Sequence, residues 1–268
     1  MPLKETVEFY LVRHAQSEAN VDKSLYTKIP DSKIALTELG IKQAEATGAF
    51  FVDHFTKKGE TRPIILRTSG HWRARQTTQR IYNALTKAGF KVHVRESDML
   101  TEQSLGQVAG RPVEEWSKHN PIYAEQFSVA KEHTSLHFLI PPNGEARLGT
   151  EVRVRMDMDS NLRYRKSHGN GPVIMVNHGE TNRQIVKVLA GKTHEESDAE
   201  PPFGNADVRL IARPASPSLL FRLLKLSQAP LTDYGFIWKN GKAYEPKAQP
   251  RIRTTDRFKA NQYDCKPD

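Results

Sequence analysis

The sequence predicts an α/β fold of three layers, α/β/α, in which a mixed and mostly parallel sheet lies between helices. Short apolar runs alternate with helical patterns along most of the chain, which is typical of strands joined by crossover helices. Two further strands late in the sequence look antiparallel, which makes the predicted sheet mixed. Because no break in composition divides the chain, we expect a single domain over residues 1–268.

The strands and helices follow from local patterns. Strands are predicted over the apolar or alternating runs 7–12, 62–68, 91–95 and 172–177, and an antiparallel pair over 206–212 and 218–226. Helices are predicted over 37–55, 71–88, 147–168 and 180–190. Thr37 is a suitable N-cap for the first helix, and Gly89 and Gly191 can end the second and the fourth.

The segment 111–145 interrupts this alternation and predicts a mostly helical, cap-like insertion over one end of the sheet. Together with the loop 21–35 it would frame a ligand bound at that end. The residues that could line that space are Tyr26, Lys28, Tyr123, His133 and His137, and each is equally suited to packing or to the surface.

The charge balance is basic, with 40 Lys and Arg against 31 Asp and Glu and a pI of about 9.5. A positive surplus favours anionic partners. Part of it lies in a predicted basic C-terminal tail, 238–268, but no recognition helix or aromatic strand motif accompanies it, so we expect no dedicated nucleic-acid binding. The sequence does not specify the oligomeric state and is compatible with a homodimer.

Targeting and cysteine content point to an ordinary intracellular protein. No apolar run is long enough to cross a bilayer, and the first residues lack the order of a signal peptide. The single cysteine, Cys265, allows neither an internal disulfide nor a multi-cysteine metal site. We therefore expect a cytoplasmic location.

Two histidines occupy equivalent positions, each directly after a predicted strand. His14 follows the run 7–12 through Arg13, and His178 follows 172–177. Ligands of open α/β sheets bind beyond the carboxyl ends of the strands, so both rings should reach one crevice. Arg13 and Arg73 could add guanidinium groups, whose planar fork suits phosphate oxygens. A lone histidine would be more simply explained as a surface or core residue.

Five motifs in order make the resemblance to a known family specific. They lie at residues 11–20 (LVRHAQSEAN), 36–44 (LTELGIKQA), 69–77 (SGHWRARQT), 100–110 (LTEQSLGQVAG) and 177–179 (NHG). Weaker matches occur at 144–145 and at Asn205. This pattern resembles the histidine phosphatase superfamily, in its phosphoglycerate-mutase-like branch, over roughly residues 7–212.

The resemblance implies a role for each motif residue. His14 would be the nucleophile that forms a phosphohistidine, and Glu102 would be the proton donor. The phosphate would be bound by Arg13, Gln16, Asn20, Arg73 and His178, of which Arg13, Arg73 and His178 would also stabilise the transition state. No metal and no cofactor are implied, because the arginines carry the charge that a metal would supply. The substrate would be a phosphorylated small molecule or a phosphopeptide.

Departures from the family pattern leave three functions open. Ala19 stands where the glycolytic mutases have tryptophan, and no paired-arginine segment follows Gly110, so hydrolysis of phosphate monoesters is favoured over a phosphoglycerate-type mutase. Ala15 replaces the glycine after the nucleophile and narrows its backbone freedom. That change suggests the third alternative, a weakly active or inactive regulatory protein that binds phosphorylated ligands.

Overall fold

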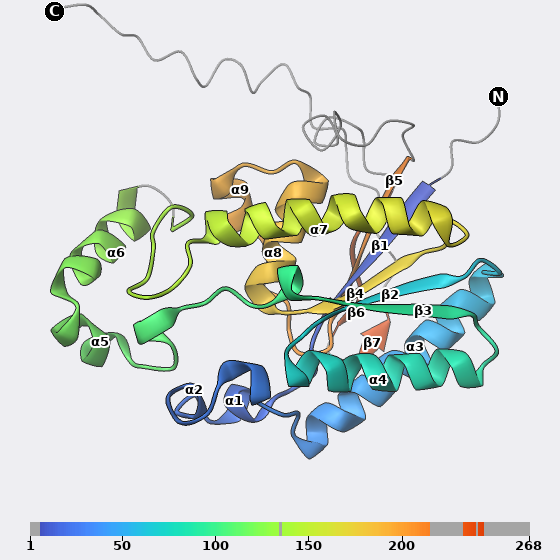
Figure 1. Cartoon of the computed structure of the whole chain (residues 1–268), viewed down its shortest axis with the longest axis horizontal. Coiled ribbons are helices and arrows are strands. Elements are labelled where there is room, and N and C mark those ends of the chain that lie inside the picture. Colours follow the sequence, from blue (N-terminus) through green and yellow to red (C-terminus); the bar gives the residue numbers. More distant parts are fainter. Residues whose placement is uncertain (1–5, 134–135, 215–232, 240, 244–268) are drawn as a thin grey trace, which may run out of the picture.

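The computed structural model describes residues 6–133, 136–214, 233–239 and 241–243, and its centre is a seven-stranded sheet of order β3-β2-β4-β1-β5-β6-β7 (Figure 1). The strands are β1 (Thr6–Arg13), β2 (Ile64–Ser69), β3 (Val92–Ser97), β4 (Val173–Asn177), β5 (Val208–Pro214), β6 (Asp233–Lys239) and β7 (Lys242–Ala243). The first four strands in that spatial order are parallel, whereas β5, β6 and β7 each pair antiparallel with the preceding neighbour. The predicted mixed, mostly parallel sheet is confirmed.

Helices α3 and α4 cover one face of this sheet, and α7 and α8 cover the other. The helices of the described residues are α1 (Glu18–Val21), α2 (Leu25–Lys28), α3 (Glu38–Lys58), α4 (Trp72–Lys87), α5 (Val113–His119), α6 (Pro121–His133), α7 (Arg147–Ser167), α8 (Gly179–Ala190) and α9 (His194–Asp198). Three short 3-10 turns, η1 (Asp31–Lys33), η2 (Asp98–Leu100) and η3 (Gly106–Val108), join some of them. Among the residues described, no helix combines the length and the apolar character needed to span a membrane.

The alternation of side chains along the central strands creates two cores. Tyr10 and Val12 of β1 pack with residues of α3 and α4, such as Phe51, on one face. Phe9 and Leu11 point to the other face, toward α7 and α8. Strands buried on both faces explain the near-continuous apolar runs of the sequence. The three-layer prediction is therefore confirmed.

The predicted helix ends agree with the backbone. Thr37 caps α3 through its side chain, which accepts a hydrogen bond of 3.0 Å from the amide of Gly40. Gly191 follows α8 with a φ of 65°, and Gly89 follows α4 with a φ of 89°. Both angles are in the left-handed region that glycine adopts without steric cost.

The end of the chain differs from the prediction. The predicted strand 218–226 lies outside the described residues, and β5 pairs antiparallel with β1 on one side and with β6 on the other. The predicted start of the basic tail at residue 238 is also wrong, because Trp238 belongs to β6 and stacks on Phe50 with ring centroids 5.0 Å apart. An aromatic residue followed by lysines carries little strand signal, which explains the error. Residues 244–268 of the tail are not described.

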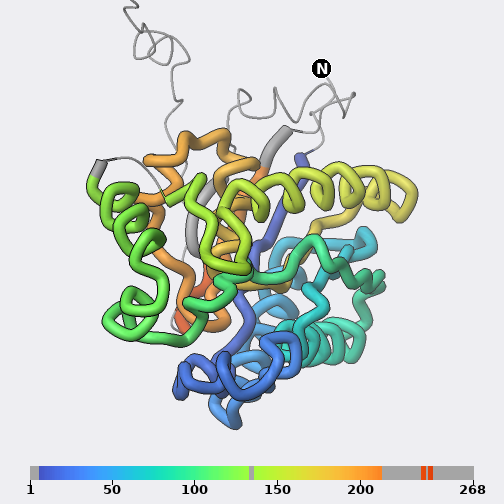
Figure 2. Tube along the Cα trace, turned by 60° about the vertical axis from the view of Figure 1, so that its left-hand side comes forward, coloured from blue at the N-terminus to red at the C-terminus, as the bar shows by residue number. Residues whose placement is uncertain are grey.

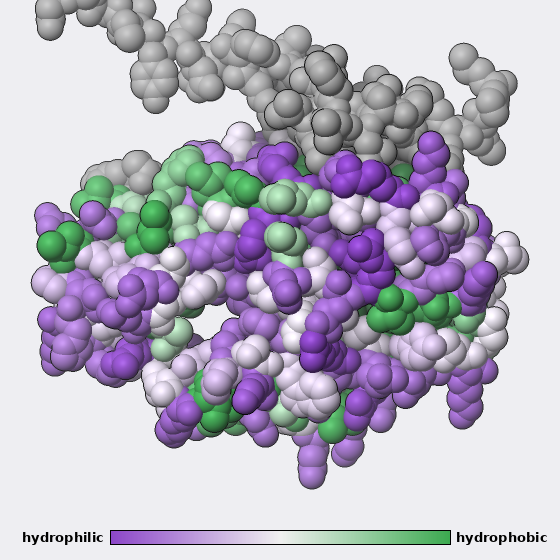
Figure 3. All heavy atoms as spheres, viewed as in Figure 1, coloured by the Kyte–Doolittle hydropathy of each residue, from purple (hydrophilic) through white to green (hydrophobic). Residues whose placement is uncertain are grey.

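The segment 111–145 forms the predicted helical insertion. Its helices α5 and α6 lie at one end of the molecule beside α1 and α2 (Figures 1 and 2). Trp116, Tyr123 and Phe127 hold the two helices together, with ring centroids 5.3 to 6.2 Å apart. The mostly hydrophilic surface is hollowed between this insertion and the segment of α1 and α2 (Figure 3).

A buried ion pair joins the sheet to α7. Arg67 of β2 and Asp157 of α7 are paired, and their side chains are 2% and 1% exposed. The second carboxylate oxygen of Asp157 accepts a hydrogen bond of 2.6 Å from Asn161. A charge removed from water to this extent depends on its partner. The pair therefore fixes how the very polar helix α7 packs on the sheet.

Candidate active site

His14 lies directly after β1 and is almost fully buried, with 4% of its surface exposed. Its Nδ1 lies 2.8 Å from the carbonyl oxygen of Ala15, which only a protonated Nδ1 can bind. Its Nε2 accepts a hydrogen bond of 3.2 Å from Nε of Arg73. Burial and the positive charges of Arg73 and Arg13 lower the pKa of His14 well below its usual value. The ring is thus neutral and directs the Nε2 lone pair toward a guanidinium group.

Arg73 lies in the first turn of α4 and is 1% exposed. Besides His14 it contacts Asp31 of η1: Nη1 lies 2.6 Å from the backbone oxygen and 2.8 Å from Oδ1 of that residue. Asp31 also lies 3.5 Å from Nδ1 of His71. A carboxylate therefore lies against the arginine that the sequence assigns to phosphate. Sequence analysis missed Asp31, since nothing in a loop sequence indicates which residue it will contact.

His178 follows β4, and its ring centroid is 5.1 Å from that of His14. The structure thus brings together the two histidines that sequence analysis paired. His178 Nε2 and the hydroxyl of Ser69 are hydrogen-bonded at 2.8 Å, and sequence analysis did not identify this partner. Among the described residues, His178 Nδ1 has no hydrogen-bond partner although it is buried. Burial and the charge of Arg73 hold the pKa of His178 well below its usual value.

Arg13 is the last residue of β1 and contacts the turn that precedes β5. Its Nη1 donates a hydrogen bond of 2.7 Å to the carbonyl oxygen of Phe203. Its Nε is buried and has no hydrogen-bond partner in the described part of the chain. Buried polar groups normally have partners, so the unused donor on Arg13 and the unpaired ring nitrogen of His178 indicate a site for a polar ligand such as a phosphoryl group.

Glu102 lies at the N-terminus of α8. Its carboxylate accepts hydrogen bonds from the amides of Gln103 at 3.0 Å, Thr181 at 3.1 Å and Glu180 at 3.3 Å. Burial and the nearby charge of Glu180 raise the pKa of Glu102, and the backbone hydrogen bonds partly oppose this increase. A raised pKa favours the protonated form that a proton donor requires. Thr181, whose hydroxyl also contacts this carboxylate at 3.3 Å, was not identified from the sequence.

Two predicted phosphate ligands have other contacts. The side chain of Gln16 accepts a hydrogen bond of 2.8 Å from Thr37, which ties it to the start of α3. The Oδ1 atom of Asn20 accepts hydrogen bonds from Ser17 and Asn205. Only the amide nitrogen of Asn20 then remains to donate to a ligand. The structure therefore gives Gln16 a positioning contact and leaves the phosphate role of Asn20 a prediction.

Ala15 replaces the family's glycine without backbone strain. Ala15 is fully buried, and its φ is not in the positive range that favours glycine. Its amide donates a hydrogen bond of 3.1 Å to the hydroxyl of Thr77. The wider conformational freedom of glycine is therefore not needed at this position. The feature that suggested an inactive regulatory protein gives no support to that function.

The remaining motif residues hold loops in place. Gln43 accepts a hydrogen bond of 2.9 Å from the amide of Gln16, and Gln76 accepts one of 2.8 Å from the amide of Leu36. Gly40 is required because a Cβ there would lie 2.0 Å from the carbonyl oxygen of Gln16. The motifs that resemble the family thus form both the site and its support.

The other candidate lining residues have mixed outcomes. Burial raises the pKa of the Tyr26 hydroxyl, and the charge of the nearby Arg73 partly opposes this increase. Tyr26 also packs against Gly110, where a Cβ would lie 2.9 Å from its own Cβ. Lys28 is exposed and donates to Ser24. The side chain of His133 lies outside the described residues.

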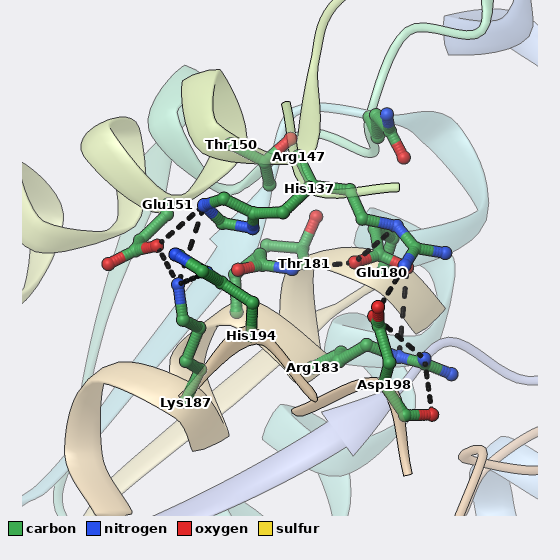
Figure 4. A network of polar contacts seen from close by, with 12 residues as sticks. His137, Arg147, Thr150, Glu151, Glu180, Thr181, Arg183, Lys187, His194 and Asp198 are labelled. Carbon is green, nitrogen blue, oxygen red and sulfur yellow. Dashed lines mark hydrogen bonds and ion pairs between the residues drawn. The ribbon is translucent and has the colours of Figure 1, made fainter. Parts of the chain in front are cut away.

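His137 belongs to a separate buried cluster. In the described ranges, His137, Glu151 and His194 form a group whose metal-binding atoms lie within 4.8 Å of one another. The Lys187 ammonium lies among them, 2.7 Å from His194 Nδ1 and 3.4 Å from His137 Nε2, and is paired with Glu151 (Figure 4). Because lysine already supplies the positive charge there, we assign no metal to this cluster.

The cluster should make stability depend on pH. Burial, then the charge of Lys187, lowers the pKa of His137 to about 4. An unfolded chain binds this proton near pH 6.5, so the free energy of unfolding should fall by roughly 3 kcal/mol between pH 6.5 and 4 from this residue. Urea unfolding across that range measures the slope. In His137→Asn the slope should be smaller, while in His119→Ala, an exposed histidine, it should match that of the wild type; equal slopes in both variants would contradict this assignment.

Comparison with known proteins identifies relatives of this arrangement. Residues 9–215 match the family model of the histidine phosphatase superfamily, branch 1. A 2,3-bisphosphoglycerate-dependent phosphoglycerate mutase of Mesorhizobium japonicum is 31% identical over 189 residues, which cover 69% of this chain and 82% of that protein. A phosphoglycerate mutase-like protein of Arabidopsis thaliana, AT74, is 29% identical over 212 residues, which cover 75% of this chain and only 63% of the relative.

Solved structures share the fold. A protein described as mycobacterial hydrolase 2 has a TM-score of 0.66 at 19% identity and covers 90% of this chain and 93% of its own. A mycobacterial glucosyl-3-phosphoglycerate phosphatase has a TM-score of 0.59 at 20% identity, and the match covers 78% of this chain and 91% of that protein. An alpha-ribazole phosphatase from Shigella flexneri has a TM-score of 0.56 at 20% identity, and the match covers 76% of this chain and 90% of that protein.

Proposed function

Because this chain belongs to the histidine phosphatase superfamily, we propose that it hydrolyses phosphate monoesters through a phosphohistidine on His14. The observation that carries the proposal is the state of that ring. Its Nδ1 faces a carbonyl oxygen and its Nε2 accepts from Arg73, so a neutral nitrogen nucleophile faces a phosphate-binding group. Superfamily members are phosphatases or mutases, which supports an enzymatic role.

The first half of the reaction transfers the phosphoryl group to the enzyme. His14 Nε2 attacks phosphorus, the bond to the ester oxygen breaks, and that oxygen takes a proton from Glu102. Arg13, Arg73 and His178 donate hydrogen bonds to the phosphoryl oxygens, where negative charge develops. The products of this step are an alcohol, a phosphohistidine and the Glu102 carboxylate.

The second half returns the enzyme to its starting state. The Glu102 carboxylate takes a proton from water, whose oxygen attacks phosphorus and breaks the bond to Nε2. Inorganic phosphate leaves, and His14 is again neutral. The raised pKa of Glu102 suits a group that must give and accept a proton in one cycle.

The substrate class follows from the charge of the site. Arg13 and Arg73 supply the positive charge for a phosphoryl dianion, so we propose that no metal is needed. A phosphorylated small molecule or a phosphopeptide fits this chemistry, and two of the solved structures that share the fold are named as phosphatases of phosphorylated small molecules.

The proposal is tested by phosphate release from 4-nitrophenyl phosphate in the presence of a metal chelator. We expect turnover without added metal, and radiolabel from a rapidly quenched reaction should remain on the protein as an acid-labile, alkali-stable phosphohistidine. Strict dependence on a divalent ion, or label that survives acid, would contradict the proposed mechanism.

Glu102→Gln should separate alkyl from aryl substrates. An alkoxide needs a proton in order to leave, whereas a nitrophenolate does not, so we expect a loss of roughly 10²- to 10⁴-fold in kcat on an alkyl phosphate and a smaller loss on 4-nitrophenyl phosphate. Steady-state kinetics on both substrates measures the difference. Glu45→Gln, the same change at an exposed position of α3, is the control and should leave both rates unchanged; equal losses on the two substrates in Glu102→Gln would exclude the donor role.

A phosphoglycerate-type mutase is the second candidate. The 31% identity to the Mesorhizobium japonicum mutase favours it, whereas Ala19 and the lack of paired arginines after Gly110 favour hydrolysis. The two are distinguished by adding a phosphoglycerate with a bisphosphorylated primer: a mutase exchanges phosphate between positions without net release, and a phosphatase releases it.

A further inference from the structure

A pocket of about 220 Å³ lies beside the candidate active site, and the mechanism above does not use it. The first turns of α8 form one wall and the turn that precedes β5 forms another; the lining includes Arg13, Gly179, Glu180, Arg183, Glu200 and Phe203. This volume can hold a group of several non-hydrogen atoms.

The pocket borders the atoms that would act on the leaving group. Gly179 has no side chain, and a Cβ at that position would lie 3.8 Å from both Arg13 Nε and Glu102 Oε2. The open face of Gly179 therefore looks toward a phosphate-binding donor and the proton carrier. A leaving group whose oxygen is protonated by Glu102 would extend from there toward the pocket.

Arg183 brings a positive charge to this pocket that the protein balances only weakly. Its Nε lies 3.7 Å from Glu180, and its Nη1 lies 3.9 Å from the carboxylate and 3.3 Å from the backbone oxygen of Asp198. Arg147 holds Asp198 more closely, at 2.5 Å, and also contacts Glu180 at 3.4 Å. Figure 4 shows that Arg147 and Arg183 both contact the carboxylates of Glu180 and Asp198. Arg183 therefore keeps donor capacity for an incoming anion.

The acidic residue on the opposite wall is already neutralised. Glu200 is paired with Lys192 and, at 2.7 Å, with Arg209. Its repulsion of an incoming anion is thereby reduced. The pocket thus combines Arg13 and Arg183 with carboxylates that other cations hold, which favours a negatively charged occupant.

We propose that this pocket binds a second anionic group, a carboxylate or a phosphate, on the leaving part of the substrate, and that Arg183 is the residue that selects it. The inference rests on the proposed phosphatase function and adds a substrate class: phosphate monoesters with an additional negative charge beyond the ester oxygen. Arg183 contacts the anion and takes no part in proton or phosphoryl transfer.

Three aryl phosphates of related shape test the proposal on the full chain. They are 4-carboxyphenyl phosphate, 4-carbamoylphenyl phosphate, which is the uncharged analogue, and benzene-1,4-diyl bisphosphate. For Arg183→Gln we expect kcat/KM to fall by about 10- to 100-fold on the charged substrate that fits the pocket, mainly through KM, and by less than about twofold on the carbamoyl analogue. The charged probe on which Arg183→Gln loses more kcat/KM shows whether the pocket prefers a carboxylate or a phosphate.

Two variants control for charge and structure. Arg183→Lys should recover part of the selectivity, whereas Arg163→Gln removes the same charge from the exposed face of α7 and should change nothing. Equal losses of Arg183→Gln on charged and uncharged probes would overturn the inference while the phosphatase function stands. If the wild type releases phosphate from none of the three probes, the proposed function itself fails.

Discussion

His14→Ala is expected to abolish turnover, with a loss in kcat of about 10⁴- to 10⁶-fold, the range for removal of a covalent nucleophile. The structure explains why no neighbour would replace it. His178 is hydrogen-bonded to Ser69 through Nε2, and Arg73 carries a charge that makes it a poor nucleophile. Phosphate release from 4-nitrophenyl phosphate under saturating conditions measures the effect.

The exposed His119 provides the matched control. His119→Ala removes an imidazole from α5 and should retain wild-type kcat. His14→Ala should also give no acid-labile label, and its circular dichroism should match that of the wild type. Labelled protein in the His14→Ala variant would show that another residue accepts the phosphoryl group and would contradict the assignment.

Asp157→Ala is expected to lower the free energy of unfolding by about 3–5 kcal/mol, because it leaves the guanidinium of Arg67 buried without its counter-charge. Both side chains are nearly inaccessible to solvent, at 2% and 1% exposed, so water cannot replace the lost partner without opening the contact between β2 and α7. Urea unfolding followed by circular dichroism measures the change.

A double replacement separates pairing from packing. Arg67→Met with Asp157→Leu removes both charges and fills similar space, so it should recover most of the stability that Asp157→Ala loses. The exposed pair of Asp53 and Lys57 on α3 is the control, and Asp53→Ala should cost less than about 1 kcal/mol. If Asp157→Ala is as stable as Asp53→Ala, the buried pair does not hold α7 on the sheet.

Much of the fold followed from sequence patterns because they reflect local physics. Strands buried on both faces, such as β1 and β4, are apolar over most of their length, and helix ends such as Thr37 and Gly191 depend on single residues. For these features the cause lies within a few residues of the effect. The proximity of His14 and His178 followed instead from the general rule that ligands bind beyond the carboxyl ends of the strands, and β1 and β4 are indeed adjacent and parallel.

The features that were missed depend on contacts between distant residues. Asp31 lies against Arg73 only because the loop 21–35 folds back over α4, and no pattern in the loop encodes that path. The hydrogen bond between Ser69 and His178 spans 109 positions. The cluster around Lys187 draws residues from three helices and a loop. Pairings of this kind require the three-dimensional arrangement of the elements.

The central strand order β2-β4-β1 has a consequence for how the protein acquires its site. Residues 13, 14, 73, 102 and 178 become neighbours only after parallel strands far apart in the chain have paired, because β1 and β4 are separated by 159 residues between Arg13 and Val173. Parallel pairing over such separations is entropically costly and slow. A partly folded chain, even one rich in helices, would have no assembled pocket. Recovery of activity during refolding should therefore lag behind recovery of helical signal.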